Sequence, residues 1–294
     1  MDLRHLRYFV AIAETKTMAE ASSRVFVTQS TLSHQLAQLE AELSCELFER
    51  VGRNLRLTAA GREFLGHARG VLLQVAAAKQ ALSSSSGELS GVLRVGVIHS
   101  FVTGLMPQVA SAFLKSYPRV KLQIIELTGV DIEAQVADGT LDLGMAFYPP
   151  TSSAVMGERL FDDRLKLAIP VTYPLSKKKA VRFSQLSDLP LAMLGPRFTT
   201  RLLLDGYFQL AGVRPNIVVE IDSVDALKRI VEEGVAAAFL PAKFTQRVAK
   251  AHLLDVLDPK PSRAAGLVWR RSTYRSPVST AFVETLSAAI GRLQ

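Results

Sequence analysis

The hydrophobic periodicity of this chain changes once, near Gly91, and this change constrains its fold more than any other feature. Before it, apolar residues recur at helical spacing through almost all of residues 1–90. After it, short apolar runs alternate with amphipathic helical stretches to the end of the chain. Such alternation is typical of parallel sheets with flanking helices. The sequence therefore predicts a helical head followed by an α/β unit.

Residues 1–58 predict three short helices followed by a hairpin. Asp2, Thr17 and Thr28 each precede an apolar-periodic run, and their side chains are of the types that cap helix N-termini. The third run has one leucine stripe and one polar face, whereas residues 47–58 alternate around a turn, as in a two-stranded hairpin. The leucines of that stripe are Leu32, Leu36, Leu39 and Leu43. This order of elements predicts a winged helix-turn-helix.

The polar face of the third helix has side chains suited to DNA. In a winged helix-turn-helix this helix enters the major groove, where amide and hydroxyl groups read base edges. The chain has a net charge of +8, but most of it lies beyond residue 90, so the prediction rests on placed side chains rather than on bulk charge. An ordinary solvated face is the alternative. The expected DNA-binding residues are Thr28, Gln29, Ser30, Ser33 and His34 on the third helix, Arg4 near the N-terminus, and Arg50, Arg53 and Arg56 on the hairpin.

Residues 59–90 predict a long helix and a hinge. About 26 residues keep a helical apolar pattern and would form a rod of roughly 39 Å, too long for a small domain. The stripe has no evident partner in so small a head, so we expect it to be a dimer seam. Four serines and Gly87 then predict a flexible linker. The stripe consists of Phe64, Ala68, Val71, Val75, Ala78 and Leu82.

Several stretches of the head resemble the N-terminal domain of LysR-type transcriptional regulators. Thr31 and the pair Ser44-Cys45 depart from residues common in that family, without consequence for the fold. The resemblance implies a DNA-binding regulator whose long helix dimerises and whose sensor is of the periplasmic-binding-protein type, with an effector between two α/β subdomains. The similar stretches are Thr17–Ser22, Val27–Ser33, Leu36–Leu43, Leu47–Arg50 and Leu57–Gly61.

The resemblance continues through residues 91–294, where Leu93–Val97, Leu141–Ala146 and Val235–Pro241 are similar to strands of the family's sensor. The fold class expected is an all-α winged helix-turn-helix head plus a long linker helix, followed by an α/β sensor with two subdomains like those of periplasmic binding proteins. The implied boundaries are 1–58 for the head, 59–90 for the linker helix and hinge, 91–160 with 267–294 for subdomain I, and 161–266 for subdomain II.

The expected effector site lies beyond the carboxyl ends of the sensor strands. Ligands bind there in doubly wound sheets, and hydroxyls beside helix N-termini favour a small anion or carboxylate. The resemblance places the effector at Ser100, Thr128 and Thr200, and Arg201 would add a counter-charge. The alternatives are helix caps for the three hydroxyls and a surface role for Arg201. Stretches 195–201 and 212–223 are similar to regulators of cyanate metabolism, which implies cyanate ahead of small carboxylates.

Residue spacing does not favour an enzyme. The five histidines have no metal-ligand spacing, and the sequence has neither a Gly-x-Ser-x-Gly elbow nor a glycine-rich phosphate loop. The single cysteine, Cys45, excludes an intrachain disulfide. We therefore expect no catalytic residue, metal or cofactor. The charged N-terminus and the short apolar runs predict a cytoplasmic protein without a membrane partner. The expected DNA binding adds association with the nucleoid.

The expected partners follow from the helix-turn-helix head, the long helix and the resemblance to LysR-type regulators, which implies tetramers. They are double-stranded DNA at an interrupted palindromic promoter site, a small anionic effector, and further copies of the chain in a homodimer or homotetramer. RNA polymerase is a further candidate. The alternative function is a solute-binding or ligand-converting α/β protein that does not bind DNA and carries an incidental helical arm.

Overall fold

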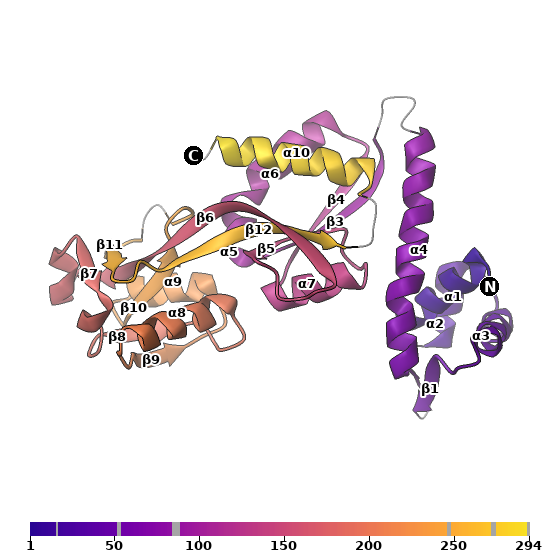
Figure 1. Cartoon of the computed structure of the whole chain (residues 1–294), viewed down its shortest axis with the longest axis horizontal. Helices are drawn as coiled ribbons and strands as arrows, with labels where there is room; N and C mark the ends of the chain where they lie inside the picture. Colours follow the sequence, from indigo (N-terminus) through magenta and orange to yellow (C-terminus); the bar gives the residue numbers. More distant parts are fainter. Residues whose placement is uncertain (16, 52–53, 84–88, 246–247, 272–274, 293–294) are drawn as a thin grey trace.

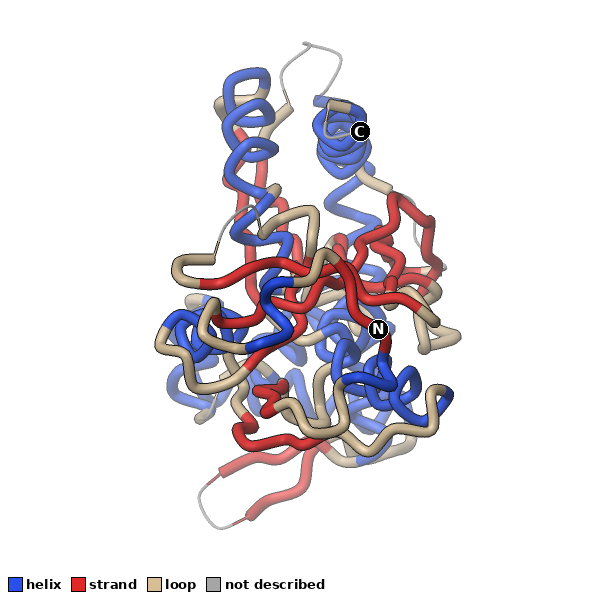
Figure 2. Tube along the Cα trace, turned by 90° about the vertical axis from the view of Figure 1, so that its left-hand side faces the viewer, coloured by secondary structure: helices blue, strands red, loops and turns tan. Residues whose placement is uncertain are grey.

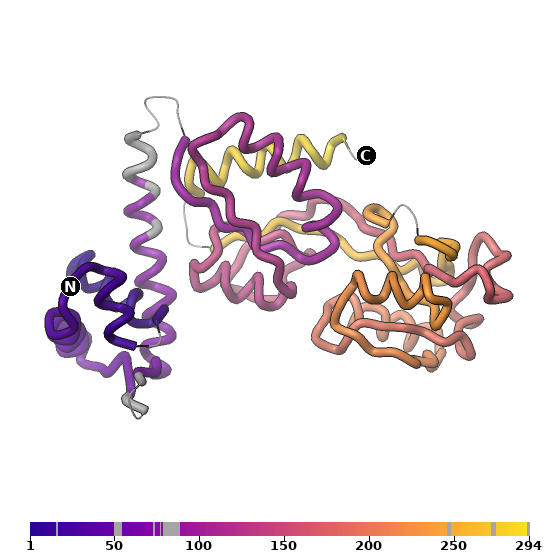
Figure 3. Tube along the Cα trace, turned by 180° about the vertical axis from the view of Figure 1, so that it is seen from behind, coloured from indigo at the N-terminus to yellow at the C-terminus, as the bar shows by residue number. Residues whose placement is uncertain are grey.

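In the computed structural model, the chain forms a helical head, one long helix and an α/β unit with two lobes (Figure 1). The two lobes lie side by side, and the long helix runs along the one nearer to the head (Figures 1 and 3). The structure describes residues 1–15, 17–51, 54–83, 89–245, 248–271 and 275–292. No helix in these ranges is long and apolar enough to cross a bilayer.

The head contains the predicted three helices and hairpin. The predicted caps are confirmed: the side chain of Asp2 accepts from the backbone N–H groups of Arg4 and His5, and the hydroxyls of Thr17 and Thr28 each accept from the N–H three residues later. The hairpin is antiparallel and projects from the lower end of the head (Figure 2). The elements are α1 (Leu3–Ala13), α2 (Met18–Val25), α3 (Gln29–Leu43), β1 (Phe48–Val51) and β2 (Asn54–Leu57).

The long helix α4 (Ala59–Ser83) forms part of the head core. The ring of Phe64 lies 5.0 Å from that of Phe9 in α1, centroid to centroid, and Ala68 is buried against the same cluster. This corrects the reason given for a dimer seam, because Phe64 and Ala68, the first two residues of the apolar stripe, already have partners inside the head. Val71 is exposed, so the unpartnered part of the stripe begins about there.

The lobe nearer to the head, subdomain I, has β3 in the middle of a parallel trio, with β4 and β5 on either side. Its core contains Phe101, Phe113 and Phe282, all fully buried. The elements are β3 (Gly91–Val97), α5 (His99–Gly104), α6 (Met106–Ser116), β4 (Val120–Glu126), α7 (Gly129–Ala137), β5 (Leu143–Tyr148) and α10 (Pro277–Gly291). The short helix α5 directly after β3 was not predicted.

The other lobe, subdomain II, packs apolar clusters on both faces of its sheet. Its elements are two 3-10 helices (Pro174–Lys177 and Phe183–Gln185), β7 (Ala180–Arg182), β8 (Pro190–Met193), α8 (Thr199–Leu210), β9 (Asn216–Glu220), α9 (Val224–Glu232), β10 (Ala237–Pro241) and β11 (Ala251–Leu257). The sequence predicted neither β7 nor β11.

Two long strands run through both lobes and join them. These are β6 (Val155–Pro170) and β12 (Ser262–Arg270), which pair antiparallel with each other. β12 also pairs antiparallel with β5, and β6 with β10, so the sheet is mixed rather than purely parallel. Among the short apolar runs of the sequence, Leu165–Pro170 predicts a strand, and in the structure it is only the last part of β6. Its first part was missed because the alternation there is interrupted by charged residues on the exposed face.

Candidate functional site

A cavity of about 220 Å³ lies between the two subdomains, at the carboxyl ends of their parallel strands. Ser100 follows β3, Thr128 follows β4, Thr200 follows β8 and Asp222 follows β9, and all four line this one cavity. The fold brings them together because strand ends meet at one edge of each sheet and the two edges face each other. The walls between them are mostly apolar, with Phe147 among the residues that line the cavity.

Arg263 of β12 connects the two sides of this cavity. Its Nη2 donates to the Ser100 hydroxyl at 3.1 Å, and its Nη1 donates to the Thr200 hydroxyl at 2.7 Å. The guanidinium carbon lies 4.6 Å from the ring centre of Phe147. Ser100 belongs to subdomain I and Thr200 to subdomain II, so one side chain bridges both lobes. The sequence analysis did not single out Arg263, because nothing local distinguishes it from a surface arginine.

The charge of Arg263 is held by a buried carboxylate. Asp163 of β6 accepts from Nε at 2.9 Å and from Nη2 at 2.7 Å through the same Oδ2 atom, and it is fully buried. Burial lowers the pKa of the Arg263 guanidinium, and the Asp163 carboxylate opposes that shift. The second carboxylate oxygen, Oδ1, is buried without a hydrogen-bond partner among the described residues. Arg263 and Asp163 therefore form a fixed ion pair whose net charge is close to zero, and this pair supports the site.

Thr128 lines the cavity but its hydroxyl is already engaged. It caps α7, donating to the Asp131 carboxylate at 2.6 Å and accepting from the Asp131 backbone N–H at 3.3 Å. At the mouth of the cleft, the imidazole of His99 lies 2.8 Å from Glu126 and 3.4 Å from Asp225 of α9. Glu126 belongs to subdomain I and Asp225 to subdomain II, so His99 forms a second polar contact between the lobes.

Arg201, for which the sequence predicts a counter-charge to the effector, lies outside the cavity lining and contacts two carboxylates. Its guanidinium donates to Asp205 at 2.9 Å, to Glu220 at 2.7 Å and to the backbone carbonyl of Leu194 at 2.8 Å. Two carboxylates therefore satisfy it on the side of α8 that faces β9, and it does not line the cavity. Arg197 does line the cavity, paired with Asp222 at 3.0 Å.

The predicted DNA-binding side chains of α3 share one exposed face. Gln29, Ser30, Ser33 and His34 are all exposed, and Thr28 caps the helix directly beside them. Phe26, which the sequence analysis did not single out, occupies the turn before α3 in a left-handed conformation and is 94% exposed.

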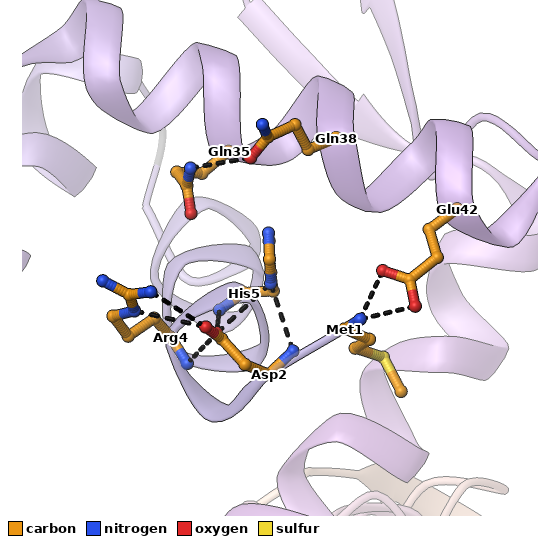
Figure 4. Close-up of polar contacts among 7 residues, drawn as sticks. All are labelled: Met1, Asp2, Arg4, His5, Gln35, Gln38 and Glu42. Carbon is orange, nitrogen blue, oxygen red and sulfur yellow. Dashed lines mark hydrogen bonds and ion pairs between the residues drawn. The ribbon is translucent and has the colours of Figure 1, made fainter.

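The predicted arginines of the head are placed unevenly. Arg4 pairs with Asp2 on the first turn of α1, near the polar pair of Gln35 and Gln38 on α3 (Figure 4). Arg56 of β2 extends into solvent, 3.9 Å from Glu49. The side chain of Arg50 and the whole of Arg53 lie outside the described residues.

The described residues contain no cluster of three or more histidine, cysteine, aspartate or glutamate side chains that could hold a metal ion. Cys45 is exposed and lies in the head, just beyond the end of α3.

Comparison with known proteins covers both parts of the chain. The family model of the LysR substrate binding domain matches residues 86–291, and that of the bacterial regulatory helix-turn-helix protein, lysR family, matches residues 3–62. The transcriptional regulator AlsR of Bacillus subtilis is 30% identical over 244 residues, covering 82% of this chain and 81% of that protein.

Solved structures show the same arrangement over the full length. A full-length OxyR variant from Pseudomonas aeruginosa has a TM-score of 0.81 and 26% identity, covering 99% of this chain and 94% of that one. Full-length CbnR in complex with its target DNA shares the fold, with a TM-score of 0.66 and 24% identity over 98% of this chain and all of that one. These matches decide against an α/β protein with an incidental helical arm. The chain belongs to the LysR family of transcriptional regulators, with a DNA-binding helix-turn-helix head and a substrate-binding sensor.

Proposed function

We propose that this regulator responds to a small monoanion, a carboxylate or cyanate, bound between the subdomains by Ser100, Thr200 and Arg263. The observation that carries the proposal is the bridge of Arg263 to both hydroxyls. Each hydroxyl accepts a hydrogen bond from the guanidinium, so its own proton is free to point into the cavity. Arg263 also retains one N–H that no described contact uses. Three donors from both lobes then converge on one oxyanion.

The charge balance of the cavity supports a single negative charge on the effector. Arg263 is neutralised by Asp163, and Arg197 by Asp222. Glu126 also lines the cavity. A dianion such as a phosphate ester would meet no uncompensated cation here, whereas a monoanion is satisfied by hydrogen bonds and helix amides. The largely apolar walls suit a compact apolar body on a carboxylate, and Thr128 would contribute through the N-terminus of α7.

We further propose the following roles for the head. Gln29, Ser30, Ser33 and His34 read base edges of an interrupted palindrome in the major groove, while Thr28 positions the helix terminus against a phosphate. Arg4, Arg50, Arg53 and Arg56 contact the DNA backbone or the minor groove. The regulator works in the cytoplasm on the nucleoid, where its DNA is, as a homodimer or homotetramer that contacts RNA polymerase. It catalyses no reaction.

Calorimetry of the full-length protein with sodium cyanate, acetate and benzoate tests the effector proposal. We expect at least one of these anions to bind, and Ser100→Ala and Thr200→Val each to weaken binding by about tenfold, since each removes a hydrogen bond to a charged group. Thr285→Val is the matched control, because the Thr285 hydroxyl donates to Ala281 in α10, away from the cavity. Unchanged affinity in both cavity variants would place the anion elsewhere.

A further inference from the structure

The sensor contacts the linker helix α4 through an arginine at the end of β12. Arg270 donates from Nε to the carbonyl of Ala137, the last residue of α7, at 2.8 Å, and from Nη2 to the carbonyl of Gly66 in α4 at 3.0 Å. Gly70, one turn further along α4, makes room for it: a Cβ at Gly70 would lie 2.4 Å from Nη1 of Arg270. We call this contact between Arg270, Ala137 and α4 the clasp.

A second arginine joins the clasp to the head. Arg69 of α4 pairs with Asp138, directly after α7, at 2.9 Å, and with Glu14, directly after α1, at 3.0 Å. Its side chain is only 13% exposed. Glu14 also pairs with Arg24 of α2 at 2.6 Å. A continuous chain of ion pairs therefore runs from the sensor through α4 to the first two helices of the head.

The two elements that end at the clasp begin at the effector cavity. Thr128 and Gly129, at the N-terminus of α7, line the cavity, and the C-terminus of α7 lies roughly 14 Å further on, at the clasp. β12 carries Arg263 in the cavity and Arg270 in the clasp. α7 is one regular helix, and β12 runs without a break from Arg263 to Arg270, with one register shift between Ala265 and Gly266. Each element therefore gives a continuous physical connection from the cavity to the clasp.

α7 and β12 also pack against each other in the core of subdomain I. Ile132 and Val136 of α7 meet Val268 of β12 above Gly144 of β5, and all three side chains are fully buried. A Cβ at Gly144 would lie 2.3 Å from Ile132 and 2.6 Å from Val268, so the helix packs as close to the sheet as atoms allow. Such close-packed contacts have discrete arrangements and do not deform gradually.

We propose that α7 and β12 form a relay, through which an anion in the cavity alters the clasp and thereby the position of α4 and the head. This relay rests on the proposed function in that it takes the cavity as the effector site. An anion that accepts from both hydroxyls and from the remaining N–H of Arg263, beside the N-terminus of α7, displaces β12 and α7 and loosens the clasp.

Two alanine variants on the same helix test the relay. Gly70→Ala displaces the Arg270 guanidinium without removing a charge. Gly66→Ala adds the same methyl group one turn earlier, where its nearest neighbour is the Asp138 Cα at 4.0 Å, and it serves as the control. Both changes raise helix propensity equally, so a difference between them reports on the clasp rather than on α4 itself.

The measurements use the full-length protein and whichever of cyanate, acetate or benzoate binds it. Because coupling between sites is reciprocal, a clasp that opposes anion binding lowers affinity until it is broken. We expect the dissociation constant to fall by about fivefold or more in Gly70→Ala and to stay within about twofold of wild type in Gly66→Ala. An unchanged or raised constant in Gly70→Ala would overturn the relay.

Hydrogen exchange separates a failed relay from a failed effector site. If none of the three anions binds, the proposed function is wrong, but the relay still predicts that Ser100→Ala combined with Thr200→Val reduces amide protection in α4 around Gly66–Gly70. The same amides should lose protection in Gly70→Ala. Protection of α4 that does not respond to the cavity variant would refute the relay, whatever the anion experiments show.

Discussion

Replacing Arg263 by methionine should destabilise the sensor strongly, because it leaves the buried Asp163 carboxylate without its counter-ion. Asp163 is fully buried, and both charge-assisted bonds to its Oδ2, at 2.7 and 2.9 Å, come from Arg263. Each bond to a charged group contributes about 1.5–3 kcal/mol. Removing one partner of a buried pair costs about 3–5 kcal/mol. For a domain of this size that corresponds to a loss on the order of 10 °C in melting temperature.

The assay uses the chain's single tryptophan. Trp269 lies on β12, six positions after Arg263, so its fluorescence reports the denaturant unfolding of the sensor. The matched control is the double variant Arg263→Met with Asp163→Leu, which removes both charges and should recover most of the loss. A loss below about 1 kcal/mol in the single variant, or no recovery in the double variant, would refute the buried-pair reasoning.

Three further predictions concern packing, acid stability and DNA. Gly144→Ala should cost about 1–3 kcal/mol in the same fluorescence assay by overpacking the core, whereas Gly206→Ala, with open space around it, should not destabilise the sensor. Backbone hydrogen bonds, chiefly from the N–H of His5, hold the pKa of the Asp2 carboxyl at about 2. The stabilisation of the head by this carboxylate is therefore present above the pKa of Asp2 in the unfolded chain and is lost as the pH falls toward 2. In Asp2→Asn, the helicity measured by circular dichroism should depend less on pH in this acidic range. In binding titrations, Gln29→Ala should weaken cognate DNA selectively, while Arg56→Ala should weaken all sequences alike and reduce the salt slope by about one.

The local features of this protein could be predicted from the sequence. The caps at Asp2, Thr17 and Thr28 depend on residues three or fewer positions away, and the amphipathic stripe of α3 depends on spacing within one helix. The same holds for the start of α4 after Thr58 and for the strand ends that line the cavity. The family resemblance added the pairing of a helical head with a two-subdomain sensor.

The function of each arginine was decided only by tertiary structure. Arg201 and Arg263 are alike in sequence terms. Arg201 is nevertheless satisfied by carboxylates on α8 and β9, while Arg263 reaches a serine 163 positions away and Thr200, the second residue of α8. Likewise, the hydrogen bond from Arg270 to Gly66 of α4 joins residues 204 positions apart. The periodicity of apolar residues predicts which side of a helix or strand is buried, but it does not predict which other element covers that side. The pairing of β6 with β12 and the packing of α7 determine which residues meet, and they thereby determine the cavity and the clasp.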